Sequence, residues 1–183
     1  MPKIINNEKV YKETCLLLEA KGFDGVTTKE IAMNSNIDES SLFRKYVSKT
    51  KLVCSAVNYT FSKVSFANQQ WTGNLEEDLY NIVESYKETA NVYGPLLQVV
   101  IMELPRHPDL KGSVVSAKNN ISNICSIIKK YQDSNVLKKG NSMDLVASLI
   151  GPLAMIAMSK LAINMKMPET KDYVSRFLIG NKN

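Results

Sequence analysis

The chain has 183 residues, of which 44% are hydrophobic and 22% are charged, with only 8 Gly and 6 Pro. This composition excludes a disordered or collagen-like chain and predicts a folded protein with a sizeable core. The 23 Lys and Arg outnumber the 18 Asp and Glu, and the net charge of +5 is compatible with nucleic acid or a membrane surface without establishing either. The one histidine, His107, excludes metal sites built on two histidines and most catalytic relays. We therefore expect no cofactor and no metal.

The cysteines and the apolar segments indicate a compartment. Cys15, Cys54 and Cys125 are odd in number, far apart and without a C-x-x-C pair, so a reducing environment is favoured over a disulfide framework. The N-terminus has no continuous apolar stretch of the kind that secretory signals carry. The most apolar segment, 145–158, is shorter than the ~20 residues of a bilayer-spanning helix and contains Gly151-Pro152. We expect a soluble, cytoplasmic protein with no membrane association.

Apolar residues recur at helical spacing along almost the whole chain, and the first helices have clear boundaries. A first helix is predicted over 3–21, ended by Gly22. The sequence Thr27-Thr28-Lys29-Glu30 has the pattern of a capping box and opens a second, short helix. Asn36 can adopt the left-handed conformation of a tight turn. These signals predict two short helices joined by a tight turn.

Asp38 is a suitable N-cap for a third helix over 39–46, and Ser48 for a fourth from 49 to about 70. In the rest of the chain, glycine and proline residues indicate where helices begin and end. The fold class is predicted to be all-α with about nine helices, an N-terminal three-helix helix-turn-helix domain followed by a larger C-terminal helical bundle. The further helices are expected over 75–93, 95–104, 110 to about 131, 141 or 142 to 165, and 168 to about 179.

In the segment 10–52 the first helix ends in Gly-aromatic, a Thr-rich cap precedes Ile-Ala, and a turn leads to a helix that ends in aromatics and Ser-Lys. This order of motifs resembles the N-terminal DNA-binding domain of TetR-family transcriptional regulators, in which the last of these helices is the recognition helix. The resemblance implies a DNA-binding domain over 1–50 and a ligand-binding and dimerisation domain over 51–183. The matching residues are Gly22, Phe23, Thr27, Thr28, Ile31, Ala32, Ile37, Leu42, Phe43, Tyr46, Ser48, Lys49 and Leu52.

A basic cluster accompanies this motif. Residues 44–51 contain four basic residues and no acidic one. Cationic side chains and free backbone amides at helix starts are suited to phosphate. The DNA-binding residues we predict are Thr27, Thr28, Lys29, Glu39, Ser40, Ser41, Arg44, Lys45 and Lys49.

The roles within this set differ. The N-terminal half of the third helix is expected to face base edges, where Glu39 can accept from a cytosine amine and serines can position. Arg44 can make a bidentate guanine contact. Thr28, Lys29 and Lys49 are expected to bind phosphates.

Three residues depart from the family pattern. Phe43 stands where the family usually has a tyrosine whose hydroxyl binds phosphate, Ser40 where it often has glycine, and Asn36 where the turn glycine is usual. The Asn36 change is mild because asparagine tolerates the left-handed conformation. The operator sequence and affinity therefore cannot be carried over from relatives.

The resemblance also implies two tasks for the C-terminal helices. Residues 143–165 are apolar around most of the helix circumference, which favours cover by a second subunit, although an ordinary core within one chain gives the same pattern. The predicted dimer interface comprises Leu149, Leu153, Ile156, Tyr173 and Phe177, and the predicted effector pocket comprises Phe61, Phe66, Tyr86, Tyr93, Leu97, Ile101, Met102, Met155 and Met158.

The functional expectation is a homodimeric regulator that binds a double-stranded DNA operator, most simply a repressor released by a small apolar or aromatic effector. A helical ligand-binding or adaptor protein without specific DNA binding is the alternative. An enzyme is disfavoured because the sequence has no Gly-rich phosphate loop, no G-x-S-x-G and no H-E-x-x-H. Glu103 and His107, beside Pro105, are expected at a helix end on the surface.

Overall fold

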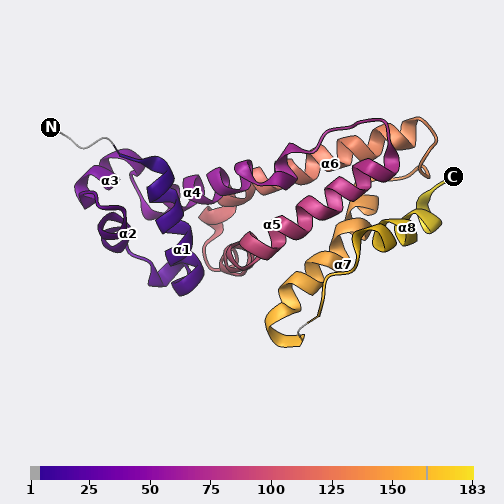
Figure 1. The fold of residues 1–183 in the computed structure, drawn as a ribbon. Coiled ribbons are helices and arrows are strands. Elements are labelled where there is room, and N and C mark those ends of the chain that lie inside the picture. The colour runs from indigo at the N-terminus through magenta and orange to yellow at the C-terminus, as the bar shows by residue number, and fades with distance from the viewer. Residues whose placement is uncertain (1–4, 164) are drawn as a thin grey trace. The chain divides into compact units, whose positions relative to one another are not determined.

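The computed structural model describes residues 5–163 and 165–183, with the side chains of 160–163 left out. The described residues form eight α-helices and two short 3₁₀ helices and contain no strand (Figure 1). The all-α prediction is confirmed. The elements are α1 (Asn7–Gly25), α2 (Thr28–Ser35), α3 (Glu39–Tyr46), α4 (Lys49–Lys63), η1 (Ser65–Asn68), α5 (Leu75–Glu103), η2 (Pro108–Val114), α6 (Val115–Asp133), α7 (Ser142–Ile163) and α8 (Thr170–Asn181).

The N-terminal helix boundaries follow from local signals. The predicted first helix included residues 3 and 4, which lie outside the described residues, and α1 is capped by the Asn6 side chain. Gly22 has φ 68°, but the chain resumes helical geometry and α1 extends to Gly25. Asn36 has φ 56° and ψ 47°, the left-handed conformation predicted for the turn between α2 and α3. Asp38 occupies the N-cap of α3 without a side-chain hydrogen bond.

The chain divides into two compact units. The first comprises residues up to Lys63 together with Pro95–Ala117, and the second comprises Val64–Gly94 and Lys118–Asn183. The predicted division between residues 50 and 51 falls inside α4 and within the first unit. The first unit extends past it because Leu52, Val53, Ala56 and Val57 are all fully buried.

A buried apolar cluster holds α1 to α4 of the first unit together. The interior positions of α2 and α3, Ile31, Ala32 and Leu42, are at most 3% exposed, as expected for the core of a helix-turn-helix. Phe23 is also buried. The cluster consists of Val10, Val26, Ile31, Ala32, Leu42, Tyr46 and Leu52.

Two predicted helix boundaries differ most from the structure. Gly94-Pro95 does not end a helix, since α5 runs from Leu75 to Glu103 with Pro95 inside it. Proline removes one backbone donor but its fixed φ is close to the helical value, so helical geometry can continue through it. The fourth helix ends at Lys63 and not near residue 70, because Val64 is extended (φ −68°, ψ 152°) and is buried in the core of the second unit.

The second unit is built on α5, α6, α7 and α8. Its core includes Leu79, Ile128 and Leu149, each fully buried. A buried carboxylate, Asp78, fixes the turn before α5: it accepts from the Thr72 backbone amide at 3.0 Å and from the Tyr131 hydroxyl. Burial and the Asp78 carboxylate raise the pKa of Tyr131 above its ordinary value.

Helix α7 is strongly apolar, although little of its apolar segment is buried within the chain. Within the described residues one window, Ser142–Ser159, is long and apolar enough to cross a membrane by length and composition, which is weak evidence for a span. The expectation that this segment is too short is thus corrected, since α7 reaches Ile163 through Pro152. Only 22% of the window is buried within the chain. Much of an apolar helix therefore faces outward.

Candidate nucleic-acid interface

The start of α2 is fixed by the capping box that the sequence predicted. The Thr27 hydroxyl accepts from the Glu30 amide at 3.2 Å, and the Thr27 amide donates to the Glu30 carboxylate at 3.3 Å. The Lys21 ammonium, 2.6 Å from the same carboxylate, and the Thr27 donors hold the pKa of Glu30 below its usual value. The free amides at the start of α2 are thereby held in one orientation.

Helix α3 separates a buried side from an exposed one. Leu42 and Tyr46 are 1% and 6% exposed and pack into the core of the first unit. The predicted contact residues Ser40, Arg44 and Lys45 are exposed. The helix therefore anchors itself by apolar residues and presents a polar, basic surface outward.

Thr28 and Glu39 form a contact that the sequence did not reveal. The Thr28 hydroxyl donates to the Glu39 carboxylate at 2.6 Å, joining the first residue of α2 to the first residue of α3. Thr27 and Lys29 beside it are exposed, whereas Glu39 and Ser41 are partly buried. The bond engages the two side chains with each other, and it orients the start of α3 relative to α2.

The two cations of α3 differ in their surroundings. The Lys45 ammonium donates to Asn7 Oδ1 at the start of α1, and the Tyr46 hydroxyl donates to the same oxygen at 3.2 Å. The side chain of Arg44 forms no hydrogen bond or ion pair with any residue in the described part of the chain. Its guanidinium is thus available to an external partner without breaking an internal bond.

Lys49 has internal partners that the sequence did not predict. Its ammonium donates to the backbone oxygens of Phe23 at 2.8 Å and Val26 at 3.1 Å, and it lies 4.2 Å from the centroid of the Phe23 ring. These are the carbonyls at the C-terminal end of α1, where a cation is favoured by the helix dipole. The Lys49 ammonium therefore joins α4 to the end of α1.

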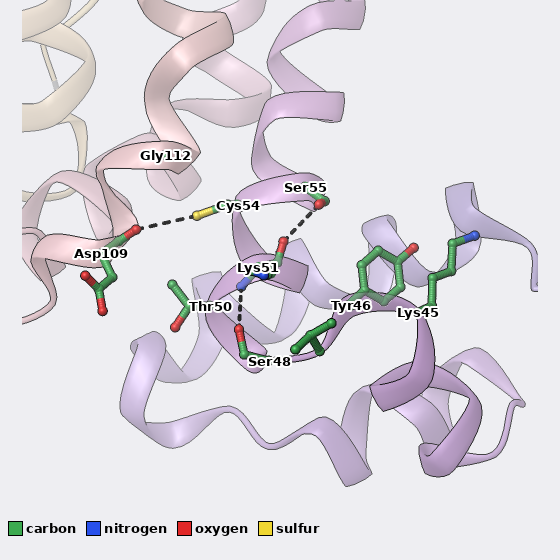
Figure 2. Close-up of a pocket in the computed structure, with 10 residues that line it drawn as sticks. Lys45, Tyr46, Ser48, Thr50, Lys51, Cys54, Ser55, Asp109 and Gly112 are labelled. Carbon is green, nitrogen blue, oxygen red and sulfur yellow. Dashed lines mark hydrogen bonds between the residues drawn. The ribbon is translucent and has the colours of Figure 1, made fainter.

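Next to the end of α3 the first unit has an open hollow of about 820 Å³, shown in Figure 2. Backbone and hydroxyl groups line it where α4 begins: the Ser48 hydroxyl accepts from the Lys51 amide at 3.2 Å. Val47, at its edge, has φ 66° and is exposed, an unusual backbone for a β-branched residue. The sequence had indicated the basic cluster here but not the hollow. Its lining comprises Lys45, Tyr46, Val47, Ser48, Thr50, Lys51, Cys54, Ser55, Asp109 and Gly112.

The predicted effector-pocket residues are divided between the two units. Phe61, Leu97, Ile101 and Met102 belong to the first unit, and the other five to the second. Four of the nine are strongly exposed, so they do not line an enclosed wall within their own unit: Ile101, Met102, Met155 and Met158. Phe66 and Tyr86 do meet, with ring centroids 5.5 Å apart.

The predicted dimer interface also needs a correction. Leu149 and Leu153 are 0% exposed within the single chain, because they belong to the core of the second unit. Tyr173 and Phe177 are partly buried against the same core, and the Tyr173 hydroxyl donates to the Leu149 carbonyl at 2.7 Å. Ile156 is partly exposed. An all-round apolar helix does not reveal which face its own chain covers, and the buried face was chosen wrongly.

The helix-turn-helix and the segments around it are similar to those of known transcriptional regulators. Residues 11–56 match the model of bacterial regulatory proteins of the tetR family. The uncharacterized HTH-type transcriptional regulator YvkB of Bacillus subtilis (strain 168) is 24% identical over 139 residues, 75% of this chain and 74% of the relative.

Solved structures share the fold over nearly the whole chain. A TetR family transcriptional regulator from Pseudomonas syringae pv. tomato superposes with a TM-score of 0.76 at 13% identity, covering 97% of each chain. The Flavonoid-responsive Regulator FrrA superposes with a TM-score of 0.73 at 16% identity, covering 96% of each chain. Residues 11–56 are therefore similar to the N-terminal domain of bacterial regulatory proteins of the tetR family.

Proposed function

We propose that this protein is a homodimeric, effector-controlled repressor that places α3 in the major groove of an operator. The observation that carries the proposal is the exposed surface of α3. Its apolar residues are buried, and its outward side presents Ser40, Arg44 and Lys45. In a helix-turn-helix the second helix of the pair reads base edges from its N-terminal half. Arg44 is suited to guanine because its guanidinium has no internal partner among the described residues.

Phosphate contacts are proposed around this helix. Thr27 and Lys29 are exposed at the start of α2, next to amides that the capping box leaves oriented outward. The hollow at the start of α4 offers Thr50 and Lys51 to a second phosphate (Figure 2). Phe43 is 46% exposed and has no hydroxyl, so it can contact only sugar or thymine methyl groups.

The homodimer is supported by the outward side of α7. Ser148, Gly151, Met155 and Met158 lie three or four residues apart and are exposed. A Cβ added at Gly151 would meet nothing within 4 Å, so a second helix has room to approach closely there. An exposed stripe of small residues and methionines of this kind is compatible with a subunit interface. These exposed residues replace Leu149 and Leu153 in the proposed interface.

The effector is proposed to be a small apolar or aromatic molecule. One structural neighbour, FrrA, is a flavonoid-responsive regulator. Partly buried aromatic residues of the second unit, Tyr86 and Tyr93, border its core and offer flat apolar walls. Burial raises the pKa of Tyr86 to about 12, which indicates that its hydroxyl lies in apolar surroundings. Release would follow if the effector binds better to the form that does not fit DNA.

A random-sequence selection with the full-length protein tests the proposal. We expect enrichment of an inverted repeat whose half-sites lie about one helical turn apart, as two α3 helices of a dimer require. The enriched site is then measured by fluorescence anisotropy with wild type, Arg44→Ala and Lys139→Ala. Lys139 is an exposed lysine of the second unit and controls for the loss of one positive charge.

The two variants separate recognition from general charge. Arg44→Ala is expected to weaken the enriched site by about 1–3 kcal/mol and to relax the preference at one base pair. Lys139→Ala is expected to leave both unchanged. Enrichment of no sequence, together with a stable dimer, would contradict the proposal and favour a helical ligand-binding or adaptor protein.

A further inference from the structure

Three side chains with metal-binding atoms meet in the first unit, away from the exposed surface of α3. Asp24 lies near the end of α1, Glu103 is the last residue of α5, and His107 immediately precedes η2. One ligand atom from each residue lies within 4.8 Å of the other two. The proposed DNA contacts use none of these residues.

Glu103 is held by only one of its two carboxylate oxygens. Its Oε1 accepts from the Phe23 amide at 3.0 Å. Gly22, with φ 68°, permits this approach, since a Cβ at that position would lie 2.8 Å from Oε1. Glu103 Oε2 is buried and has no hydrogen-bond partner. A carboxylate oxygen shielded from water and left without a donor is costly, and a bound cation would remove that cost.

His107 likewise has a buried polar atom without a hydrogen-bond partner. Its Nε2 is buried without a hydrogen bond, although it lies 3.1 Å from Asp24 Oδ1 and 3.8 Å from Glu103 Oε2. The Phe23 ring, with its centroid 4.6 Å from that of the imidazole, restricts the plane of the ring. Ligand atoms bound at ~2.0–2.2 Å to one ion are roughly 3–3.6 Å from one another. The two measured separations, 3.1 and 3.8 Å, are close to that arrangement.

We propose that Asp24, Glu103 and His107 bind one divalent transition-metal ion of the zinc type. An imidazole nitrogen with two carboxylate oxygens favours Zn²⁺ and its neighbours over Ca²⁺ and Mg²⁺, which take oxygen ligands almost exclusively. Three protein ligands leave a further position for water or an anion. The ion joins the end of α1 to the end of α5 within the first unit. The site stands independently of DNA binding.

This site was not predicted from the sequence, because the single histidine was used to exclude only metal sites built on two histidines. A single histidine excludes ligand sets with two histidines, but it does not exclude one histidine with two carboxylates. The spacing along the chain gave no further signal, since α2, α3, α4 and nearly all of α5 lie between Asp24 and Glu103 in the sequence. Only the approach of Glu103 to Gly22 brings the three side chains together.

The single histidine makes the test unusually specific. In a ¹H–¹³C NMR spectrum of the tag-free full-length protein, every imidazole signal belongs to His107. Titration with Zn²⁺ is expected to shift that signal and to saturate at one ion per chain. Zinc bound only by Cys15, Cys54 or Cys125 would leave it unmoved.

Two variants complete the experiment. Asp24→Asn removes one ligand at an exposed position and is expected to weaken Zn²⁺ binding about tenfold or more. Asp133→Asn, which removes an exposed carboxylate on α6, is the matched control and is expected to bind like wild type. An imidazole signal that does not move at saturating Zn²⁺, or equal affinities for Asp24→Asn and wild type, would overturn the proposal and leave a plain histidine–carboxylate contact.

Discussion

Replacing Lys49 by methionine distinguishes a structural lysine from a DNA-binding one. Methionine keeps the length of the side chain and its contact with the Phe23 ring, but it removes the ammonium that donates to the Phe23 and Val26 carbonyls at 2.8 and 3.1 Å. The change therefore isolates the charge and its two hydrogen bonds.

The expected loss of stability follows from those contacts. A hydrogen bond from a charged donor contributes ~1.5–3 kcal/mol, and the low end applies here because Lys49 is only partly buried. The ring contact at 4.2 Å adds ~0.5–1 kcal/mol, much of which a methionine sulfur regains. The Phe23 carbonyl also keeps a longer bond from the Val26 amide. The sum is a destabilisation of the first unit by about 2–3 kcal/mol.

Hydrogen exchange measured by mass spectrometry is the suitable assay, because it reports on α1 and α4 separately from the second unit. We expect the globally protected amides of these helices to exchange about 30- to 150-fold faster in Lys49→Met, at ~1.4 kcal/mol per factor of ten. Lys29→Met is the control: Lys29 is exposed and has no partner among the described residues, so its loss is expected to change stability by no more than ~0.5 kcal/mol.

The two lysines are expected to behave in opposite ways with DNA. Lys29→Met should reduce the log–log salt slope of DNA binding by about 0.9, the loss of one neutralised phosphate. Lys49→Met should leave the slope of the folded protein unchanged. Unchanged exchange in Lys49→Met combined with a slope smaller by ~0.9 would refute the structural role and restore the phosphate contact.

Three further substitutions test the local geometry. Gly22→Ala is expected to lose at least ~1–2 kcal/mol, since alanine is strained at φ 68° and its Cβ would approach Glu103; an urea midpoint equal to wild type would contradict this. Thr27→Ala should cost about 1 kcal/mol by removing the cap of α2, measured by exchange of the α2 amides, and undiminished protection there would count against the capping box. Hydrogen bonds from Thr170 and Lys87 lower the pKa of Glu84 from 4.5, so this group stabilises the fold above that pH and the benefit is lost as the pH falls below it. The stability difference between wild type and Glu84→Gln should therefore shrink on acidification below 4.5, and a difference that stays constant would refute the assignment.

Local signals predicted the helix-turn-helix to the residue where they were strong. The third helix was expected over 39–46 and is observed over Glu39–Tyr46. The capping box at Thr27 and the left-handed Asn36 were also correct, because both depend on residues within one turn. Such features need no knowledge of the rest of the chain.

Features set by tertiary contacts could not be predicted in the same way. Lys49 carries the same charge whether it binds a phosphate or the end of α1, and only the position of α1 decides between them. The apolar residues of α7 give no sign of which face the chain covers, so Leu149 was placed in an interface and is found in the core. Gly94-Pro95 has the composition of a helix end, yet α5 continues through it.

The central claim is that the exposed side of α3 binds DNA, and the salt dependence of binding tests it most directly. Affinity for the selected site is measured by anisotropy over a range of salt concentrations for wild type and Arg44→Ala. The account predicts a steep linear decline of log affinity with log salt for wild type, ~0.9 per phosphate neutralised, and a weaker, less selective interaction for Arg44→Ala. A shallow slope, or an Arg44→Ala variant with the affinity and selectivity of wild type, would contradict it.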